Sequence, residues 1–100
     1  MFVVDGDNLE LRFNMNKIKT VETMHKVSMM SELSQSQGIL SFSLLEALFT
    51  VGLYNTTKET TIAGKKAQDI FESLLKEEGY GNINAAVVGK LQEDLGFLFR

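Results

Sequence analysis

The most constraining feature of this chain is a long, almost uncharged stretch in its middle. Within residues 33–57, Glu46 is the only charged side chain. Over residues 39–53, apolar side chains fall on nearly every side of a helix and leave a narrow polar strip of Ser43, Glu46 and Thr50, where we expect Glu46 to be exposed. A helix that is apolar almost all round is buried on most of its surface. We therefore expect a helix over 39–53 at the centre of the fold or shared with a partner protein.

The length and composition predict a single domain spanning residues 1–100. A chain of 100 residues with 44% hydrophobic content can fill one core. It contains no cysteine, so neither a disulfide framework nor a thiolate zinc site is available.

The charge balance disfavours two classes of partner. Thirteen acidic residues against ten basic ones give a formal charge of -3, which is unfavourable for nucleic acid and for an acidic membrane surface. Asp5, Asp7 and Glu10 interrupt the N-terminus, which excludes a signal peptide of the usual pattern. No segment approaches the ~20 apolar residues that span a bilayer. We expect a cytoplasmic protein.

Residues 2–13 predict a β-hairpin with its turn in the Asp-Gly-Asp-Asn segment at 5–8. A two-residue loop would pair Val4 with Asp7, and a four-residue loop would pair Val4 with Leu9. Either register leaves one apolar face, which must lie on helices because an isolated hairpin is marginal in water. The expected apolar face comprises Phe2, Val4, Leu9, Leu11 and Phe13, and the expected outward residues are Asp7, Glu10 and Arg12.

The apolar periodicity predicts three further helices, over about 15–27, 58–78 and 84–95. Residues 28–38 are predicted to be a connection with room for a turn of helix. The sequence thus favours an α+β fold, mostly α, with an N-terminal hairpin packed on about four helices. The expected details are a cap at Asn14 or Asn16, an inward stripe of Ile18, Val21 and Met24 or His25, a capping box of Thr56 and Glu59 with Thr60 or Thr61 as alternative caps, a helix end at Gly79, and a last helix opening at Asn82 or Asn84.

The sequence offers no catalytic, metal or cofactor motif. Numbered from Asp5, a calcium loop would need glycine at its sixth position and glutamate at its twelfth, where this chain has Glu10 and Asn16. His25 is the only histidine, and one histidine without cysteines or clustered carboxylates makes a poor metal site. We therefore expect a protein that is not an enzyme and has no cofactor.

An apolar cluster near the C-terminus is the strongest interface signal. Phe97, Leu98 and Phe99 follow each other, and chain ends fray in water unless they dock on something. We expect these three residues to contact either the domain's own core or another protein. Phe42 and Phe49 are further interface candidates, with ordinary core packing as the alternative for both.

The layout resembles the tail assembly chaperones of long-tailed, siphophage-type bacteriophages or prophages of Gram-positive bacteria. The matching parts are the short hairpin, a helix with Ile18, Val21 and Glu22, the segment LEALFTVGLY at 45–54, and above all EEGYGNINAAVVGKLQEDLGFLF at 77–99. This resemblance implies a non-enzymatic protein that self-associates and holds the tape measure protein soluble in the host bacterial cytoplasm. It also implies recruitment of the major tail protein and absence from the mature virion.

Two other binding roles remain open at this point. One is a self-associating adaptor that dimerises through the 39–53 helix and the C-terminal apolar cluster. The other is a structural tail or head-completion protein that stays in the virion. An enzyme would need a site built from Glu46, His25 or tyrosines without a recognisable geometry.

Overall fold

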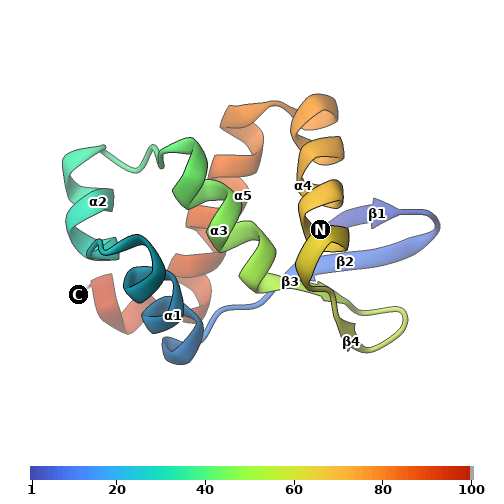
Figure 1. The fold of residues 1–100 in the computed structure, drawn as a ribbon, viewed down its shortest axis with the longest axis horizontal. Helices are drawn as coiled ribbons and strands as arrows, with labels where there is room; N and C mark the ends of the chain where they lie inside the picture. The colour runs from blue at the N-terminus through green and yellow to red at the C-terminus, as the bar shows by residue number, and fades with distance from the viewer. Residues whose placement is uncertain (100) are drawn as a thin grey trace.

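The computed structural model describes residues 1–99, which form a helical body with a small antiparallel sheet at one end (Figure 1). The chain runs β1-β2-α1-α2-α3-β3-β4-α4-α5 and closes with a 3-10 helix, η1. This architecture confirms the expected α+β, mostly α fold. In Figure 1 the sheet extends to one side, whereas α2 and the C-terminal end lie at the other.

Four short strands pair antiparallel in the order β1-β2-β3-β4. The turn between β1 and β2 holds only Asp5 and Gly6, both at positive φ (51° and 82°), so Val4 pairs with Asp7 as in the shorter expected loop. The hairpin is thus half of a larger sheet. The other two strands, β3 and β4, come from segments that the sequence predicted to be helix or a polar connection. The strands are β1 (Phe2–Val4), β2 (Asp7–Leu11), β3 (Leu53–Asn55) and β4 (Thr60–Thr61).

Asp7 does not face outward as expected. Side chains alternate along a strand, so Asp7 shares the face of Leu9, and it is half-buried. Its carboxylate accepts a hydrogen bond from Asn55 Nδ2 (2.9 Å) and pairs with Lys58 Nζ (3.3 Å). The Asn55 hydrogen bond lowers the pKa of the Asp7 carboxyl. Asp7 therefore joins β2 to β3 and to the turn that follows.

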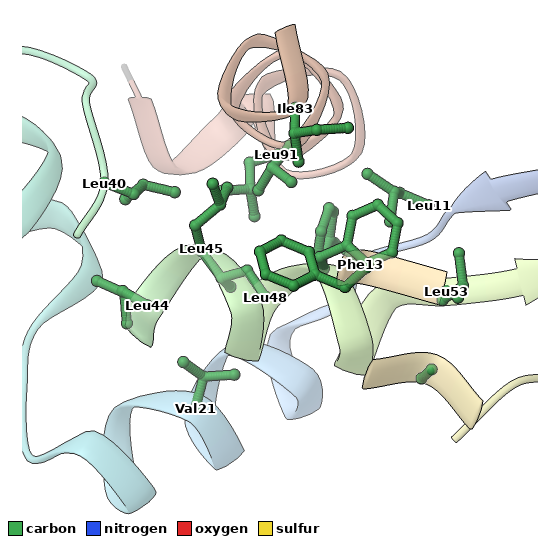
Figure 2. Packing of buried hydrophobic residues seen from close by; sticks show 14 of the residues in the cluster. Leu11, Phe13, Val21, Leu40, Leu44, Leu45, Leu48, Leu53, Ile83 and Leu91 are labelled. Atoms are coloured by element: carbon green, nitrogen blue, oxygen red, sulfur yellow. The ribbon is translucent and has the colours of Figure 1, made fainter. Parts of the chain in front are cut away.

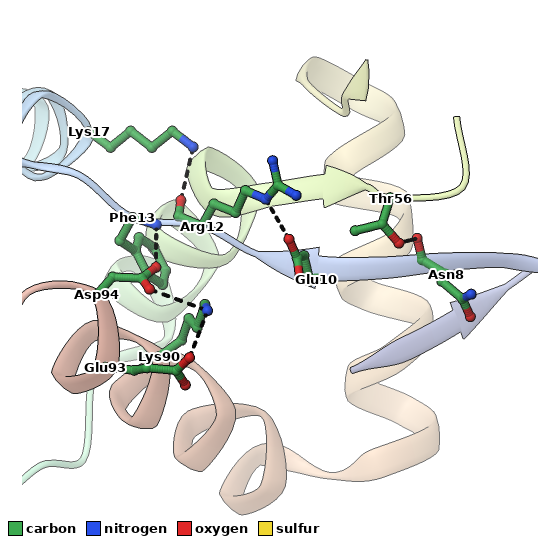
Figure 3. Close-up of polar contacts among 9 residues, drawn as sticks. All are labelled: Asn8, Glu10, Arg12, Phe13, Lys17, Thr56, Lys90, Glu93 and Asp94. Atoms are coloured by element: carbon green, nitrogen blue, oxygen red, sulfur yellow. Dashed lines mark hydrogen bonds and ion pairs between the residues drawn. The ribbon is translucent and has the colours of Figure 1, made fainter. Parts of the chain in front are cut away.

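Glu10 and Arg12 lie on the outer face of the sheet. The two side chains form an ion pair (Figure 3), and the Arg12 guanidinium carbon lies 3.7 Å from the centroid of the Tyr54 ring. Exposed pairs of this kind contribute little to stability. This face therefore gives no sign of a specialised site.

α1 (Met15–His25) begins one residue after Asn14, whose side chain accepts the Lys17 N–H (2.9 Å). Ile18 and Val21 are buried as expected, but Met24 is 73% exposed. The stripe continues through the half-buried His25 instead. The predicted connection over 28–38 contains a full short helix, α2 (Met29–Gln35), capped by the Ser28 hydroxyl.

α3 (Phe42–Gly52) is the central helix, as its all-round apolar pattern indicates. It contacts α1, α4, α5 and β2. Figure 2 shows Leu45 and Leu48 between Val21 of α1 and Leu91 of α5. Glu46 is half-buried rather than exposed, because neighbouring helices cover part of the polar strip. The buried side chains form one apolar cluster drawn from the sheet and all five α-helices.

α4 (Gly64–Glu78), α5 (Tyr80–Asp94) and η1 (Gly96–Phe99) complete the fold. The predicted start of α4 near residue 58 is wrong: Asn55 Oδ1 accepts the Lys58 N–H (2.9 Å), and the resulting turn leads into β4. The Thr56–Glu59 capping box and the threonine caps are therefore not formed. α5 begins before Asn82 and Asn84, which lie inside it, because Gly79 both ends α4 and precedes α5 directly.

Candidate functional site

A surface groove separates α2 from α5. Its volume is about 390 Å³, and its walls come from α2, the loop after it, α5 and η1. No charged side chain lines it. The lining residues are Met30, Leu33, Ser34, Gln37, Gly38, Val88, Gln92 and Phe99. We call this feature the α2–α5 groove.

The α2–α5 groove adjoins a tightly packed apolar layer. A cavity of about 20 Å³ lies among side chains of α1, α2, α5 and η1, and no polar side chain reaches it. Such a small apolar space has no partner for a water molecule and stays dry. The surrounding side chains are Ile18, Met29, Met30, Leu33, Leu91, Leu95, Leu98 and Phe99.

Of the residues predicted to form an interface, Phe99 lines this groove, Leu98 lines the adjoining cavity, and Phe97 precedes them in η1. α5 ends at Asp94 with Leu95 as its C-cap, and the Leu98 N–H then donates to the Leu95 carbonyl (2.9 Å) in the tight turn of η1. Leu95 is buried, whereas Phe97, Leu98 and Phe99 are 51%, 39% and 37% exposed. Large exposed apolar side chains that are contiguous mark binding surfaces. η1 thus contributes Phe99 to the groove wall and exposes Phe97 and Leu98 next to it in sequence.

Phe49 and Phe42 do not belong to that cluster. Phe49 is fully buried and packs against Phe2 and Phe71. It is therefore a core residue, which is the alternative to an interface role stated in the sequence analysis. Phe42 is 52% exposed, and its ring meets Phe71 edge-on, with 5.8 Å between centroids, and also contacts Tyr80. Phe42 contacts Tyr80 at the first residue of α5, whereas η1 follows the last residue of α5. At 1.5 Å per residue α5 is about 20 Å long, so Phe42 and η1 lie near opposite ends of this helix.

The end of α5 is fixed to the junction between β2 and α1. Asp94 Oδ2 accepts the Phe13 N–H (2.9 Å), and Lys90 Nζ pairs with Asp94 (3.2 Å) and Glu93 (3.2 Å), as Figure 3 shows. Lys17 Nζ donates to the Arg12 carbonyl in the same region (2.9 Å). These contacts hold the helix end from which η1 departs, and therefore fix one side of the groove mouth.

The loop after α2 is held by two polar side chains of α5. Asn84 is 4% exposed, donates from Nδ2 to the Gly38 carbonyl (2.7 Å), and accepts the Leu40 N–H (3.0 Å). The Tyr80 hydroxyl donates to the Leu40 carbonyl, and burial raises the pKa of this hydroxyl, which keeps its proton in place. We call these contacts the loop clamp. Sequence reasoning missed it, although Asn84 sits between Ile83 and Val87 on the apolar side of α5.

The remaining polar clusters satisfy each other. A cleft of about 390 Å³ between the hairpin and α4 contains Asp7, Lys58, Lys66 and Asp69, but Asp7 is already bound by Asn55 and Lys58. Across residues 1–99, no buried side-chain nitrogen or oxygen lacks a hydrogen-bond partner. The same residues contain no group of three or more histidine, cysteine, aspartate or glutamate side chains arranged to hold a metal ion.

The α2–α5 groove is therefore the best candidate site. Its uncharged walls and aromatic mouth suit an apolar side of a partner better than a polar small molecule. Of the helices in the described part of the chain, none is long and apolar enough to cross a membrane. Neither a protein-family model, nor a curated protein, nor a solved structure matches this chain.

Proposed function

We propose that this chain is a non-enzymatic tail assembly chaperone that binds the tape measure protein through the α2–α5 groove. The observation that carries the proposal is an uncharged groove with the partly exposed Phe99 in its wall, continued by the exposed neighbours Phe97 and Leu98 of η1. The segment that contributes these residues is also the strongest part of the sequence resemblance. The proposal therefore joins one surface feature to one sequence feature on the same residues.

The groove fits a helical client. An amphipathic helix binds a groove through apolar side chains at i, i+3 or i+4 and i+7. The walls offer Met30, Leu33 and Val88 to such side chains, and methionine adapts its shape to different partners. Because serine and glutamine form the rim, client helices would be selected by their apolar stripe rather than by their charge. A chaperone for a very long helical protein needs that tolerance.

Self-association and recruitment of the major tail protein are further parts of the proposal. Several weak groove contacts along one long client would add avidity without any strong single contact. Two further exposed apolar side chains, Ile39 and Phe42, are available for contact with another copy of the chain. Size-exclusion chromatography with light scattering measures self-association, and a strictly monomeric chain at high concentration would contradict this part of the proposal.

Co-expression with the tape measure protein of the same genome tests the proposal. The expected result is a higher soluble yield of the long protein, which then co-purifies with this chain. Unchanged solubility without co-purification would contradict the chaperone role and favour the self-associating adaptor.

Mass spectrometry of purified virions tests the third role. A chaperone should be absent from the particles, and a stoichiometric amount of this chain in them would favour a structural tail or head-completion protein. The same preparation must contain the tape measure protein, which serves as the positive control.

A further inference from the structure

We infer that α2 is a movable wall of the α2–α5 groove, a lid that swings away from α1 and α5 and widens the groove for the client helix. This inference rests on the proposed function for the identity of the client. The lid itself is a property of the free protein and is tested without a client.

The contacts of α2 are those of a bound helix in a groove. Met29 and Leu33, four residues apart, lie on one side of α2 and face the apolar layer formed by α1, α5 and η1. Met29 is buried, and Leu33 is half-buried. On the opposite side of this layer lie Ile18, Leu91 and Leu95. A client helix with two apolar residues at the same spacing would make equivalent contacts.

Both ends of α2 pass through left-handed backbone conformations. Lys26, before the helix, has φ 53° and ψ 44°, and Gln37, after it, has φ 57°. Residues other than glycine adopt this conformation at an energetic cost. These two positions release strain when the segment between them leaves its place. They are therefore suited to act as hinges.

The helix between these hinges is weak by itself. Seven residues form too few hydrogen bonds to hold a helix in water without packing. The main polar contact of α2 with the preceding helix is the Met29 N–H, which Glu22 Oε2 accepts (2.7 Å). Beyond the second hinge, the loop clamp of Asn84 and Tyr80 holds the chain firmly. Motion is thereby confined to the segment between Lys26 and Gly38.

Thiol labelling of introduced cysteines measures the opening of the lid, since the chain contains no other cysteine. Met29→Cys reports on α2, and Leu48→Cys, on the fully buried side of α3, reports on global unfolding. We expect Met29→Cys to react at least ~100-fold faster than Leu48→Cys, because local opening needs less free energy than global unfolding. Equal rates would overturn the lid.

A hinge variant gives the second test. Gln37→Val places a β-branched residue at a left-handed position and should accelerate labelling of Met29→Cys at least several-fold, while Gln68→Val, exposed on α4, should not. Equal acceleration by both variants would contradict the hinge role of Gln37.

If Met29→Cys does not fold, hydrogen exchange of the unaltered chain replaces thiol labelling. Amides of α2 must then exchange far faster than those of α3, and equal protection overturns the lid.

Binding of the tape measure protein separates the two proposals. If α2 must swing out before the client enters the groove, Gln37→Val should bind the client more tightly than the unaltered chain, because a larger fraction of molecules is open. Fast labelling of Met29→Cys without client binding would keep the lid and contradict the proposed function. Client binding with equal labelling rates at Met29→Cys and Leu48→Cys would keep the proposed function and overturn the lid.

Discussion

The loop clamp makes the sharpest stability prediction. In Asn84→Ala, two hydrogen bonds are lost: Nδ2 to the Gly38 carbonyl (2.7 Å) and the Leu40 N–H to Oδ1 (3.0 Å). Each hydrogen bond contributes about 1 kcal/mol, and a backbone group left unpaired in the interior costs a further ~1–3 kcal/mol. The higher helix propensity of alanine offsets roughly 0.5 kcal/mol of this loss of stability. We expect the free energy of unfolding to fall by about 2.5–4.5 kcal/mol.

Asn82→Ala is the matched control on the same helix. Asn82 is exposed, and its Nδ2 donates only to the Glu78 carbonyl (2.8 Å), so its replacement should change stability by less than about 0.5 kcal/mol. Urea unfolding followed by far-UV circular dichroism measures both variants. If Asn84→Ala and Asn82→Ala differ by less than about 1 kcal/mol, the clamp does not hold the loop in the way described.

Two further predictions concern the sheet and its contact with α3. A Cβ atom at Gly52 would lie 2.7 Å from Phe13 Cε1, so Gly52→Ala should destabilise the protein by about 1–3 kcal/mol in urea unfolding. Gly89 has open space around it, so the control Gly89→Ala should be neutral or stabilising by up to ~1 kcal/mol. The reverse order of stability would contradict the packing of Gly52 against Phe13. The hydrogen bond from Asn55 lowers the pKa of Asp7 in the folded state, so its stabilisation is present above the ordinary value of 3.8 and lost as the pH falls through the lower folded-state pKa. The melting temperature of Asp7→Asn should therefore depend less on pH in the acid range than that of the unaltered chain, and parallel profiles would refute the linkage.

Sequence periodicity located α1, α3, α4 and α5 because their buried stripes are long, but it did not locate the seven-residue α2. The all-round apolar character of α3 follows from its four neighbours, and it was visible in the near absence of charge around Glu46. The hairpin register was also within reach, since an Asp-Gly turn with two positive φ angles favours a two-residue loop. Local turn chemistry and hydrophobic spacing carry this information over a few residues.

Non-local contacts account for what the sequence did not reveal. β3 spans three residues that continue the apolar pattern of α3, and only pairing with β2 makes them a strand. The start of α4 was displaced because Thr56 and Glu59 have the spacing of a capping box, whereas Asn55 directs the turn. Asn84 was interpreted as a cap, although its partners lie more than forty residues away.

The candidate site was predictable only in part. Phe97, Leu98 and Phe99 were identified from their apolar character alone, but the groove beside them needs α2, which the sequence suggested only as a connection. Phe49 and Phe42 have the same residue type and lie on the same helix, yet one is in the core and the other half exposed. Their difference depends on which side of α3 the neighbouring helices cover.

The amount of tape measure protein that co-purifies with groove variants tests the central claim most directly. Leu98→Gln combined with Phe99→Gln removes the apolar side chains that η1 contributes to the groove and to the adjoining cavity, and Met24→Gln removes an exposed apolar side chain on α1 as the control. We predict at least a ~10-fold loss of co-purified client for the double variant, corresponding to about 1.4 kcal/mol, and no loss for Met24→Gln. A folded double variant that retains the full amount of client would contradict the assignment of the groove as the binding site.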